Sequence, residues 1–208
     1  QLSHRRKIFL KSKFNTYIIV ARMKTTKVLE TNISETSINE VSEVLNTSTS
    51  IRVAICNANT LVRSVRDLNI KNLINNFTIK TPDGFPVAKA LSILTKHKFP
   101  RVDGYNVFLQ TIKDGLGKDK KHYFFGNNDS TTLLMIDKLN AMFPEIKITG
   151  HLCPEFLSGD ELVARYRTVF ETIDADIVWV SLGFPKQEVF IDKLCNEVEL
   201  STNFVGIG

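Results

Sequence analysis

The chain has 208 residues, of which 43% are hydrophobic, and its formal net charge is +5. This length suits one domain with a sizeable core, and no apolar run approaches the roughly 20 residues that span a bilayer. The three cysteines are widely spaced, which argues for a reducing compartment and against a disulfide framework or a zinc site.

Positive charge is concentrated at the start of the chain, where eight of the first thirty residues are basic and Glu30 alone is acidic. The remainder is close to neutral, so we expect no nucleic-acid partner for the folded body. Residues 1–22 form a basic N-terminal arm, predicted to pack against little and to be disordered. The open alternatives are a targeting or membrane-surface arm, a nucleic-acid-binding arm, and upstream sequence with Met23 near the true start.

The first predicted elements follow this arm. Apolar residues at helical spacing predict a helix over Ile33–Leu45, with Ser34 or Ser37 as its N-cap. Ile51–Cys56 is typical of a buried strand, and Leu61–Ile74 of one amphipathic helix.

The next stretch places a carboxylate between Pro and Gly. Phe77–Lys80 alternates like a short strand, and Val87–Leu94 has helical spacing. Between them Asp83 follows Pro82, and Gly84 permits a tight turn with close backbone approach to another molecule. A strand-to-helix turn often holds ligands in α/β proteins, so Asp83 is a candidate acid or base; the alternative is a plain turn.

The second half of the chain repeats strand, glycine and helix. We expect strands over 122–126, 146–150, 177–183 and 203–208, and helices from about 107 to 115 and over 130–142, 162–173 and 186–194. This order predicts that residues 23–208 form a single α/β, Rossmann-like domain. Its largely parallel sheet has helices on both faces and a ligand crevice at the carboxyl ends of the strands. Because the last strand ends with the chain, we expect the natural protein to continue.

Several residues fall at that predicted crevice. Free N–H groups after Gly183 favour a diphosphate, Lys186 could add charge, and Gln187 could bind a sugar or base; the alternative is a simple helix start. Arg101 could pair with phosphate or be an ordinary surface arginine. Asn57 could bind a hydroxyl group or cap the next helix.

Other motifs are excluded or assigned to structure. The spacing Asp174-x-Asp176 matches metal-dependent sugar transferases, but it precedes a strand and so lies at the wrong edge. The four histidines have no metal-binding spacing, and no GxSxG, GxxxxGK[ST] or GxGxxG motif is present. We therefore expect no metal, no hydrolase triad and no dinucleotide cofactor.

The ordered set of motifs resembles the bacterial WecG/TagA/CpsF glycosyltransferase family from about residue 28 to the end. It comprises Asn57 after a strand, Pro82-Asp83-Gly84, Arg101-Val102-x-Gly104, Phe125-Gly126, Phe143-Pro144, Ile148-Thr149-Gly150, Gly183-x-Pro185-Lys186-Gln187-Glu188 and Val205-Gly206-x-Gly208. The Asp-Gly turn and Pro-Lys-Gln-Glu are the most specific parts.

The resemblance implies an inverting, metal-independent transferase without a cofactor. Its donor is UDP-N-acetylmannosamine or a related UDP-hexose, and its acceptor is an undecaprenyl-diphosphate-linked sugar used in teichoic acid or surface polysaccharide synthesis. Such an enzyme is cytoplasmic, peripheral at the inner face of the cell membrane. Asp83 maps to the general base, and the expected substrate-binding residues are Asn57, Gly84, Arg101, Gly126, Gly183, Lys186, Gln187 and Glu188.

Three departures from the family pattern qualify this prediction. Ile55 stands where the family often has Thr, and Gly104-Tyr105-Asn106 replaces the usual Gly-x-Asp. The C-terminal basic, aromatic-rich appendage of the family is absent from the chain. The alternative from a different class is a non-catalytic nucleotide-sugar-binding module, and the oligomeric state is left open, with a homo-oligomer among the outcomes.

Overall fold

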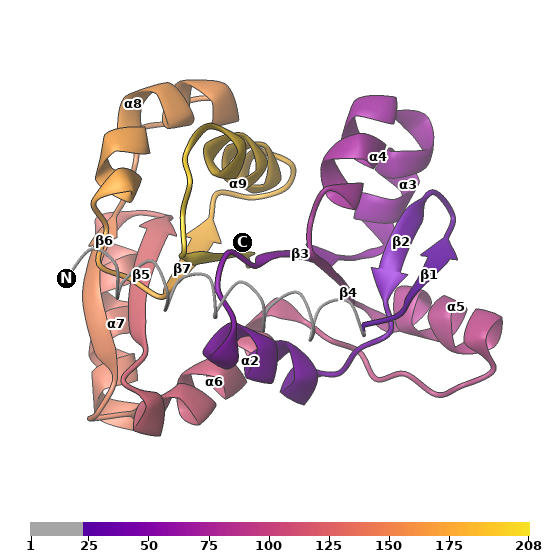
Figure 1. Ribbon diagram of the computed structural model, residues 1–208, viewed down its shortest axis with the longest axis horizontal. Helices are drawn as coiled ribbons and strands as arrows, with labels where there is room; N and C mark the ends of the chain where they lie inside the picture. Colours follow the sequence, from indigo (N-terminus) through magenta and orange to yellow (C-terminus); the bar gives the residue numbers. More distant parts are fainter. Residues whose placement is uncertain (1–22) are drawn as a thin grey trace, which may run out of the picture.

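The computed structural model describes residues 23–208, so the predictions for the N-terminal arm, 1–22, lie outside the described residues. A six-stranded sheet with the order β4-β3-β8-β7-β5-β6 runs through the centre, and every neighbouring pair in it is parallel (Figure 1). Its strands are β3 (Arg52–Cys56), β4 (Ile79–Pro82), β5 (Lys121–Gly126), β6 (Lys147–Leu152), β7 (Ile177–Ser181) and β8 (Asn203–Gly206).

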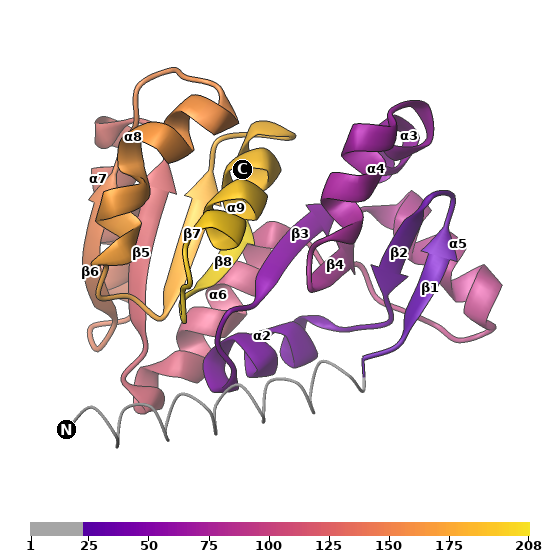
Figure 2. The ribbon, with the colours of Figure 1, turned by 45° about the horizontal axis from the view of Figure 1, so that its top comes forward.

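Helices cover both faces of this sheet, as predicted (Figure 2). One face carries α3 (Ala58–Arg66), α4 (Leu68–Asn75), α8 (Gly159–Glu171) and α9 (Lys186–Glu197), with α5 (Phe85–Thr95) beside the β4 edge. The other carries α2 (Ile38–Thr47), α6 (Gly104–Gly115), followed by a short 3-10 turn (Leu116–Lys118), and α7 (Asp129–Met142). Within residues 23–208, no helix combines the length and apolar character that crossing a bilayer requires.

The central strands are buried on both faces, which explains their nearly continuous apolar sequence. Along β7, Val178 and Val180 face the core beneath α8 and α9, whereas Trp179 faces the core beneath α2 and α6. Aromatic rings fill both layers: the ring centroids of Phe125 and Phe190 lie 4.6 Å apart on the first face. The strand period of two therefore divides one apolar run between two cores.

The helix predicted over Ile33–Leu45 begins too early. Thr31–Ser34 forms strand β2, which pairs antiparallel with β1 (Thr25–Val28). Helix α2 begins at Ile38 because Ser37 forms a capping box with Glu40. The hairpin packs beside β4, where the Ser34 hydroxyl accepts a hydrogen bond from the backbone of Lys80 (3.1 Å).

The single helix predicted over Leu61–Ile74 is two helices. Asp67 is extended (φ −135°, ψ 113°), ending α3 and beginning α4. Its carboxylate accepts hydrogen bonds from the backbone N–H groups of Asn69 and Ile70, at 2.8 and 3.4 Å. An N-cap carboxylate thus interrupts a continuous apolar period.

Gly150 was expected to end its strand but lies inside β6. The register between β5 and β6 shifts here, with Tyr123 opposite Gly150 and His122 opposite Ile148. A Cβ on Gly150 would lie 2.9 Å from the ring of Tyr123. The glycine therefore accommodates a bulge and a ring, and it lies outside the crevice edge.

The direction of the connections reverses between β5 and β7. The chain leaves β5 through α7 toward the β6 edge, and it leaves β7 through α9 toward β8. These two helices cover opposite faces of the sheet. Such a reversal is the switch point beside which α/β sheets bind ligands at their carboxyl edge.

Candidate active site

Asp83 and Arg101 form an ion pair at this carboxyl edge. The backbone N–H of Asp83 donates to the carbonyl of Cys56 (3.0 Å), which fixes Asp83 beside the end of β3. Its Oδ1 lies 3.1 Å from Nε of Arg101, and the Asp83 side chain is 19% exposed against 60% for Arg101. The carboxylate is thus held on a rigid strand end and reaches solvent.

A second carboxylate, Asp103, supports the same arginine. Its Oδ2 lies 3.8 Å from Nε of Arg101, and it caps α6 through the backbone N–H of Asn106. Burial raises the pKa of Asp103, but hydrogen bonds from Asn106 and the charge of Arg101 outweigh burial and leave this pKa below its usual value. Asp103 therefore stays ionised and contributes to orienting Arg101.

Gly84 connects Asp83 to α5 in a conformation that other residues disfavour. Its φ is +78°, and it precedes the first helical residue, Phe85. No side chain caps this helix start. The backbone N–H groups at the start of α5 consequently lie directly after the candidate base.

Asn57 takes the capping role that the sequence left open. Its Oδ1 accepts hydrogen bonds from the backbone N–H of Thr60 (3.2 Å) and from the Thr60 hydroxyl (3.4 Å). The side chain is exposed, and among residues 23–208 its amide NH2 group has no hydrogen-bond partner. It therefore caps α3 while presenting a donor at the end of β3.

The turn after β7 is open where Gly183 lies. Gly183 has φ +78°, and a Cβ there would meet nothing within 4 Å. Lys186 begins α9, with its ammonium nitrogen 3.8 Å from the ring centroid of Phe156. Arg63 reaches the same turn from α3, with its guanidinium 5.0 Å from the ring centroid of Phe184. Two cations therefore border this turn. The sequence did not point to Arg63 because its contact with Phe184 joins segments distant along the chain.

Gln187 and Glu188 are buried beneath this turn and make different contacts from those expected. The Gln187 Oε1 accepts a hydrogen bond from the backbone N–H of Gly208 (3.2 Å), and its Nε2 donates to Oε1 of Glu188 (3.0 Å). The Glu188 Oε2 is buried without a hydrogen-bond partner, and burial raises the pKa of Glu188 to about 7. These side chains form a floor beneath the crevice, and both polar ends of Gln187 are already engaged.

The end of β3 lies between the candidate base and the floor. Burial raises the pKa of the Cys56 thiol there, and the carboxylates of Glu188 and Asp83 raise it further. The candidates that follow β4 and β7 lie at the same carboxyl edge of the sheet, with the ends of β3 and β8 between them.

Gly126 serves the packing of the sheet. It ends β5 with φ +120°, and a Cβ there would lie 2.1 Å from the carbonyl oxygen of Ser181. The side that a Cβ would occupy thus faces the neighbouring strand. Asp174 and Asp176 are likewise structural, as predicted, because they pair with Lys121 and Lys120 before β7.

A basic groove lies beside the ion pair along α5. It has a volume of about 690 Å³ and includes Arg101 among its lining residues. Its other charged and large apolar lining residues are Lys89, Lys96, Lys98, Phe85, Ile93 and Phe99. The groove thus combines positive charge with apolar surface next to Asp83.

The sequence matches a known family and two curated proteins. The model of the glycosyl transferase WecG/TagA/CpsF family matches residues 26–208. Two proteins named N-acetylglucosaminyldiphosphoundecaprenol N-acetyl-beta-D-mannosaminyltransferase are similar to the chain. The one from Bacillus spizizenii is 31% identical over 115 residues, which are 54% of this chain and 42% of that protein. The one from Bacillus subtilis is 25% identical over 128 residues, which are 62% of this chain and 48% of that protein. The matched segments span less than half the length of these curated relatives.

Proposed function

Since the chain belongs to the WecG/TagA/CpsF glycosyltransferase family, we propose that it transfers N-acetylmannosamine from a UDP-sugar to an undecaprenyl-diphosphate-linked sugar. The names of the two relatives support this choice of sugar and lipid acceptor. The observation that carries the proposal is the Asp83–Arg101 pair at the carboxyl edge of the parallel sheet.

Asp83 is the proposed general base. Its carboxylate takes the proton from the acceptor hydroxyl as that oxygen bonds to the anomeric carbon. The bond from this carbon to the diphosphate breaks on the opposite side, so the configuration inverts and UDP leaves. Arg101 holds the Asp83 carboxylate in place through its Nε, and Asp103 steadies Arg101. Asp83 then releases the proton to solvent, because part of its side chain is exposed.

The diphosphate of the donor is assigned to the turn after β7. Open space at Gly183 and the start of α9 favour an anion there. Lys186 and Arg63 border the turn and can offset the charge that develops on the leaving UDP. Asn57 is the proposed donor to a hydroxyl or carbonyl oxygen of the sugar or base.

The acceptor is assigned to the basic groove along α5. Lysines of the groove suit the acceptor diphosphate, and exposed Phe85 and Ile93 suit its lipid chain or the membrane surface. Arg101 joins the groove to Asp83, so an acceptor sugar bound there reaches the base. Peripheral binding at the inner face of the cell membrane is part of this proposal.

The substitution Asp83→Asn tests the role of the base. It should lower transfer to a lipid-diphosphate acceptor by about 10²–10⁴-fold in the full-length protein, because general-base assistance is lost. The thermal midpoint and the upward shift caused by a UDP-sugar should remain, since the amide keeps the shape of the side chain. Asp137→Asn, on the exposed part of α7, is the matched control and should retain full activity.

The same assay separates the proposal from its alternative. If Asp83→Asn transferred the sugar at the wild-type rate, Asp83 would not be the general base. UDP-sugar binding without transfer to any lipid acceptor, in wild type and variant alike, would identify a non-catalytic nucleotide-sugar-binding module instead.

A further inference from the structure

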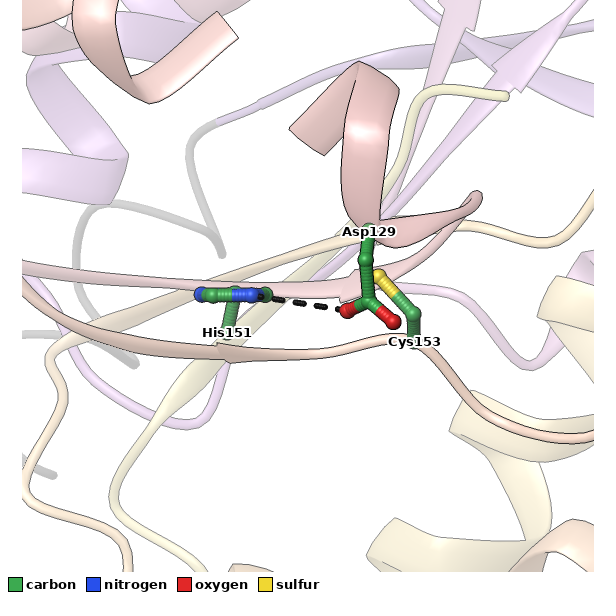
Figure 3. A group of neighbouring side chains, drawn as sticks. All are labelled: Asp129, His151 and Cys153. Atoms are coloured by element: carbon green, nitrogen blue, oxygen red, sulfur yellow. Dashed lines mark ion pairs between the residues drawn. The ribbon is translucent and has the colours of Figure 1, made fainter. Parts of the chain in front are cut away.

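Three metal-ligating side chains meet at the β6 edge, although the spacing of the histidines in the sequence indicated no metal site. Asp129 begins α7, His151 lies in β6, and Cys153 follows that strand (Figure 3). One ligand atom from each lies within 4.8 Å of the others. The distance from Asp129 Oδ1 to His151 Nε2 is 3.7 Å.

We propose that Asp129, His151 and Cys153 bind a zinc ion, with water as the fourth ligand. Zinc bonds of about 2.0–2.3 Å in a tetrahedron place neighbouring ligand atoms roughly 3.3–3.8 Å apart. For a carboxylate oxygen and an imidazole nitrogen the same geometry gives about 3.3–3.5 Å. The 3.7 Å between Asp129 Oδ1 and His151 Nε2 is therefore a few tenths of an ångström from zinc-binding geometry. A thiolate combined with imidazole favours zinc over magnesium or calcium, which prefer oxygen ligands.

The local backbone prepares this arrangement. His151 and Cys153 are two residues apart at the end of β6, so their side chains project to the same side of an extended segment. Asp129 is positioned by the start of α7, which Asn128 caps through the backbone N–H of Thr131 (3.0 Å). The buried Thr132 hydroxyl lies 3.5 Å from the Cys153 sulfur, where it can orient the ligand.

An ordinary surface ion pair accounts for Asp129 and His151, and the Cys153 thiol contacts the Thr132 hydroxyl, but only a shared ligand accounts for all three side chains meeting at one point. Cys153 is partly buried, while the Asp129 side chain is 77% exposed and that of His151 is 28% exposed. The group is therefore open to solvent on one side, which provides an entry path and room for the water ligand. The carboxylate, the imidazole and the thiol lie within 4.8 Å of one another (Figure 3).

The zinc ion would tie α7 to the edge strand. The buried residues of α7 are Thr132 and Leu139, so this helix has few apolar anchors of its own. The site is also remote from the candidate base: β6 and β4 form opposite edges of the sheet, five strand steps or roughly 24 Å apart. The proposed role is structural, and it is independent of the proposed transferase function.

Metal titration of the full-length protein tests the site. After removal of metal with a chelator, Zn²⁺ and Co²⁺ are titrated at neutral pH, by calorimetry and by absorbance respectively. We expect one equivalent to bind, and we expect Co²⁺ to give tetrahedral d–d bands with a thiolate charge-transfer band. Zn²⁺ should raise the thermal midpoint increasingly with concentration, because it binds only the native arrangement.

Zn²⁺ affinity should fall by tenfold or more in each of the variants Asp129→Asn, His151→Ala and Cys153→Ser. Loss of an outer-shell partner alone already costs about 10–100-fold, so loss of a ligand costs at least as much. Matched controls are Asp137→Asn on the same helix, His97→Ala and Cys195→Ser, which should bind as wild type does. Circular dichroism of the metal-free variants verifies that each is folded.

Each outcome decides the proposal. Absence of one-equivalent binding in the wild-type protein overturns it, as does binding that persists unchanged in Cys153→Ser. Binding without the thiolate charge-transfer band also overturns it, because the metal then lies elsewhere.

Discussion

Glu188, beneath the crevice, makes the stability of the folded protein depend on pH. The residue is 1% exposed, and its carboxyl group has one hydrogen-bonded oxygen and one without a partner. Burial without full compensation favours the neutral form, so the carboxyl keeps its proton to higher pH than usual. The protonated form avoids placing a charge in the buried floor.

We predict that Glu188 makes the folded state less stable as pH rises between about 4.5 and 7. Below pH 4.5 both states are protonated; above it the unfolded chain loses the proton, while the folded protein keeps it until about 7. A difference of about 2.5 units corresponds to about 3 kcal/mol lost over this window, with little further change above it. Denaturant unfolding of wild type and Glu188→Gln across this range measures the effect.

Comparing wild type with Glu188→Gln separates the effect of Glu188 from that of His122, which changes stability with pH in the opposite direction. Burial lowers the pKa of His122 to about 4, so its contribution to stability is lost as pH falls below about 6.5. Because His122 is present in both proteins, it cancels from the difference between their pH profiles. Equal slopes in wild type and Glu188→Gln would show that folding does not change the pKa of Glu188, and would contradict the prediction.

At the scale of elements, the close approach of β5 and β7 determines the shape of the crevice. Gly126 lies directly opposite Ser181 in the register, and the backbone N–H of Asn127 donates to the Ser181 carbonyl (2.9 Å). The two strands then diverge into α7 and α9 on opposite faces. A glycine is required here because the carbonyl occupies the space that a side chain would need.

We predict that Gly126→Ala destabilises the fold by at least about 2 kcal/mol. The alanine would adopt an unfavourable positive φ, and its Cβ would meet a backbone atom that cannot move aside easily. The matched control is Gly117→Ala, where a Cβ would meet nothing within 4 Å. Urea unfolding of both variants tests the prediction, which fails if they are equally stable.

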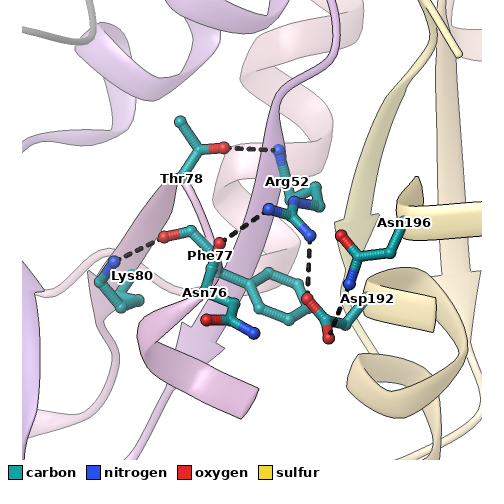
Figure 4. Close-up of polar contacts among 7 residues, drawn as sticks. All are labelled: Arg52, Asn76, Phe77, Thr78, Lys80, Asp192 and Asn196. Carbon is teal, nitrogen blue, oxygen red and sulfur yellow. Dashed lines mark hydrogen bonds and ion pairs between the residues drawn. The ribbon is translucent and has the colours of Figure 1, made fainter. Parts of the chain in front are cut away.

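At the scale of the whole molecule, polar side chains join the layers at the amino ends of the strands, opposite the crevice. Arg52 in β3 pairs with Asp192 in α9 (2.8 Å) and donates to the carbonyl of Asn76 after α4 (3.0 Å), as Figure 4 shows. Nearby, the buried ammonium of Lys80 donates to the carbonyl of Phe77, and burial lowers the pKa of Lys80.

Asn203 joins the start of β8 to α2 and β3 and should be essential for stability. Its side chain accepts from the backbone N–H of Ile51 and donates to the carbonyls of Leu45 and Ser48, each at 2.9 Å. We expect Asn203→Ala to lower the free energy of unfolding by about 3 kcal/mol, because three buried backbone groups lose their partner. Chemical denaturation measures it, with exposed Asn140→Ala as control; a change below about 1 kcal/mol would contradict this role.

The sequence pattern predicted an element correctly where a single physical cause, such as strand burial or a tight turn, set that pattern. The apolar strands, the glycine that ends β5, the glycine after β7, and Asp83 at the end of β4 were predictable, because strand burial and tight turns leave strong local signatures. The hairpin of Thr25–Ser34 and the break at Asp67 were missed, since four-residue strands and a capping carboxylate interrupt periodicity only briefly.

The sequence by itself determined the α/β class, the parallel sheet and the group of residues at its carboxyl edge, because these depend on periodicity and on chain order. Only the tertiary structure decided which of these residues meet. It paired Asp83 with Arg101, buried Gln187 and Glu188 as a floor, and brought Asp129 to His151 and Cys153. The physical reason is that contacts between side chains distant in sequence depend on strand order and packing, and neither leaves a signature along the chain.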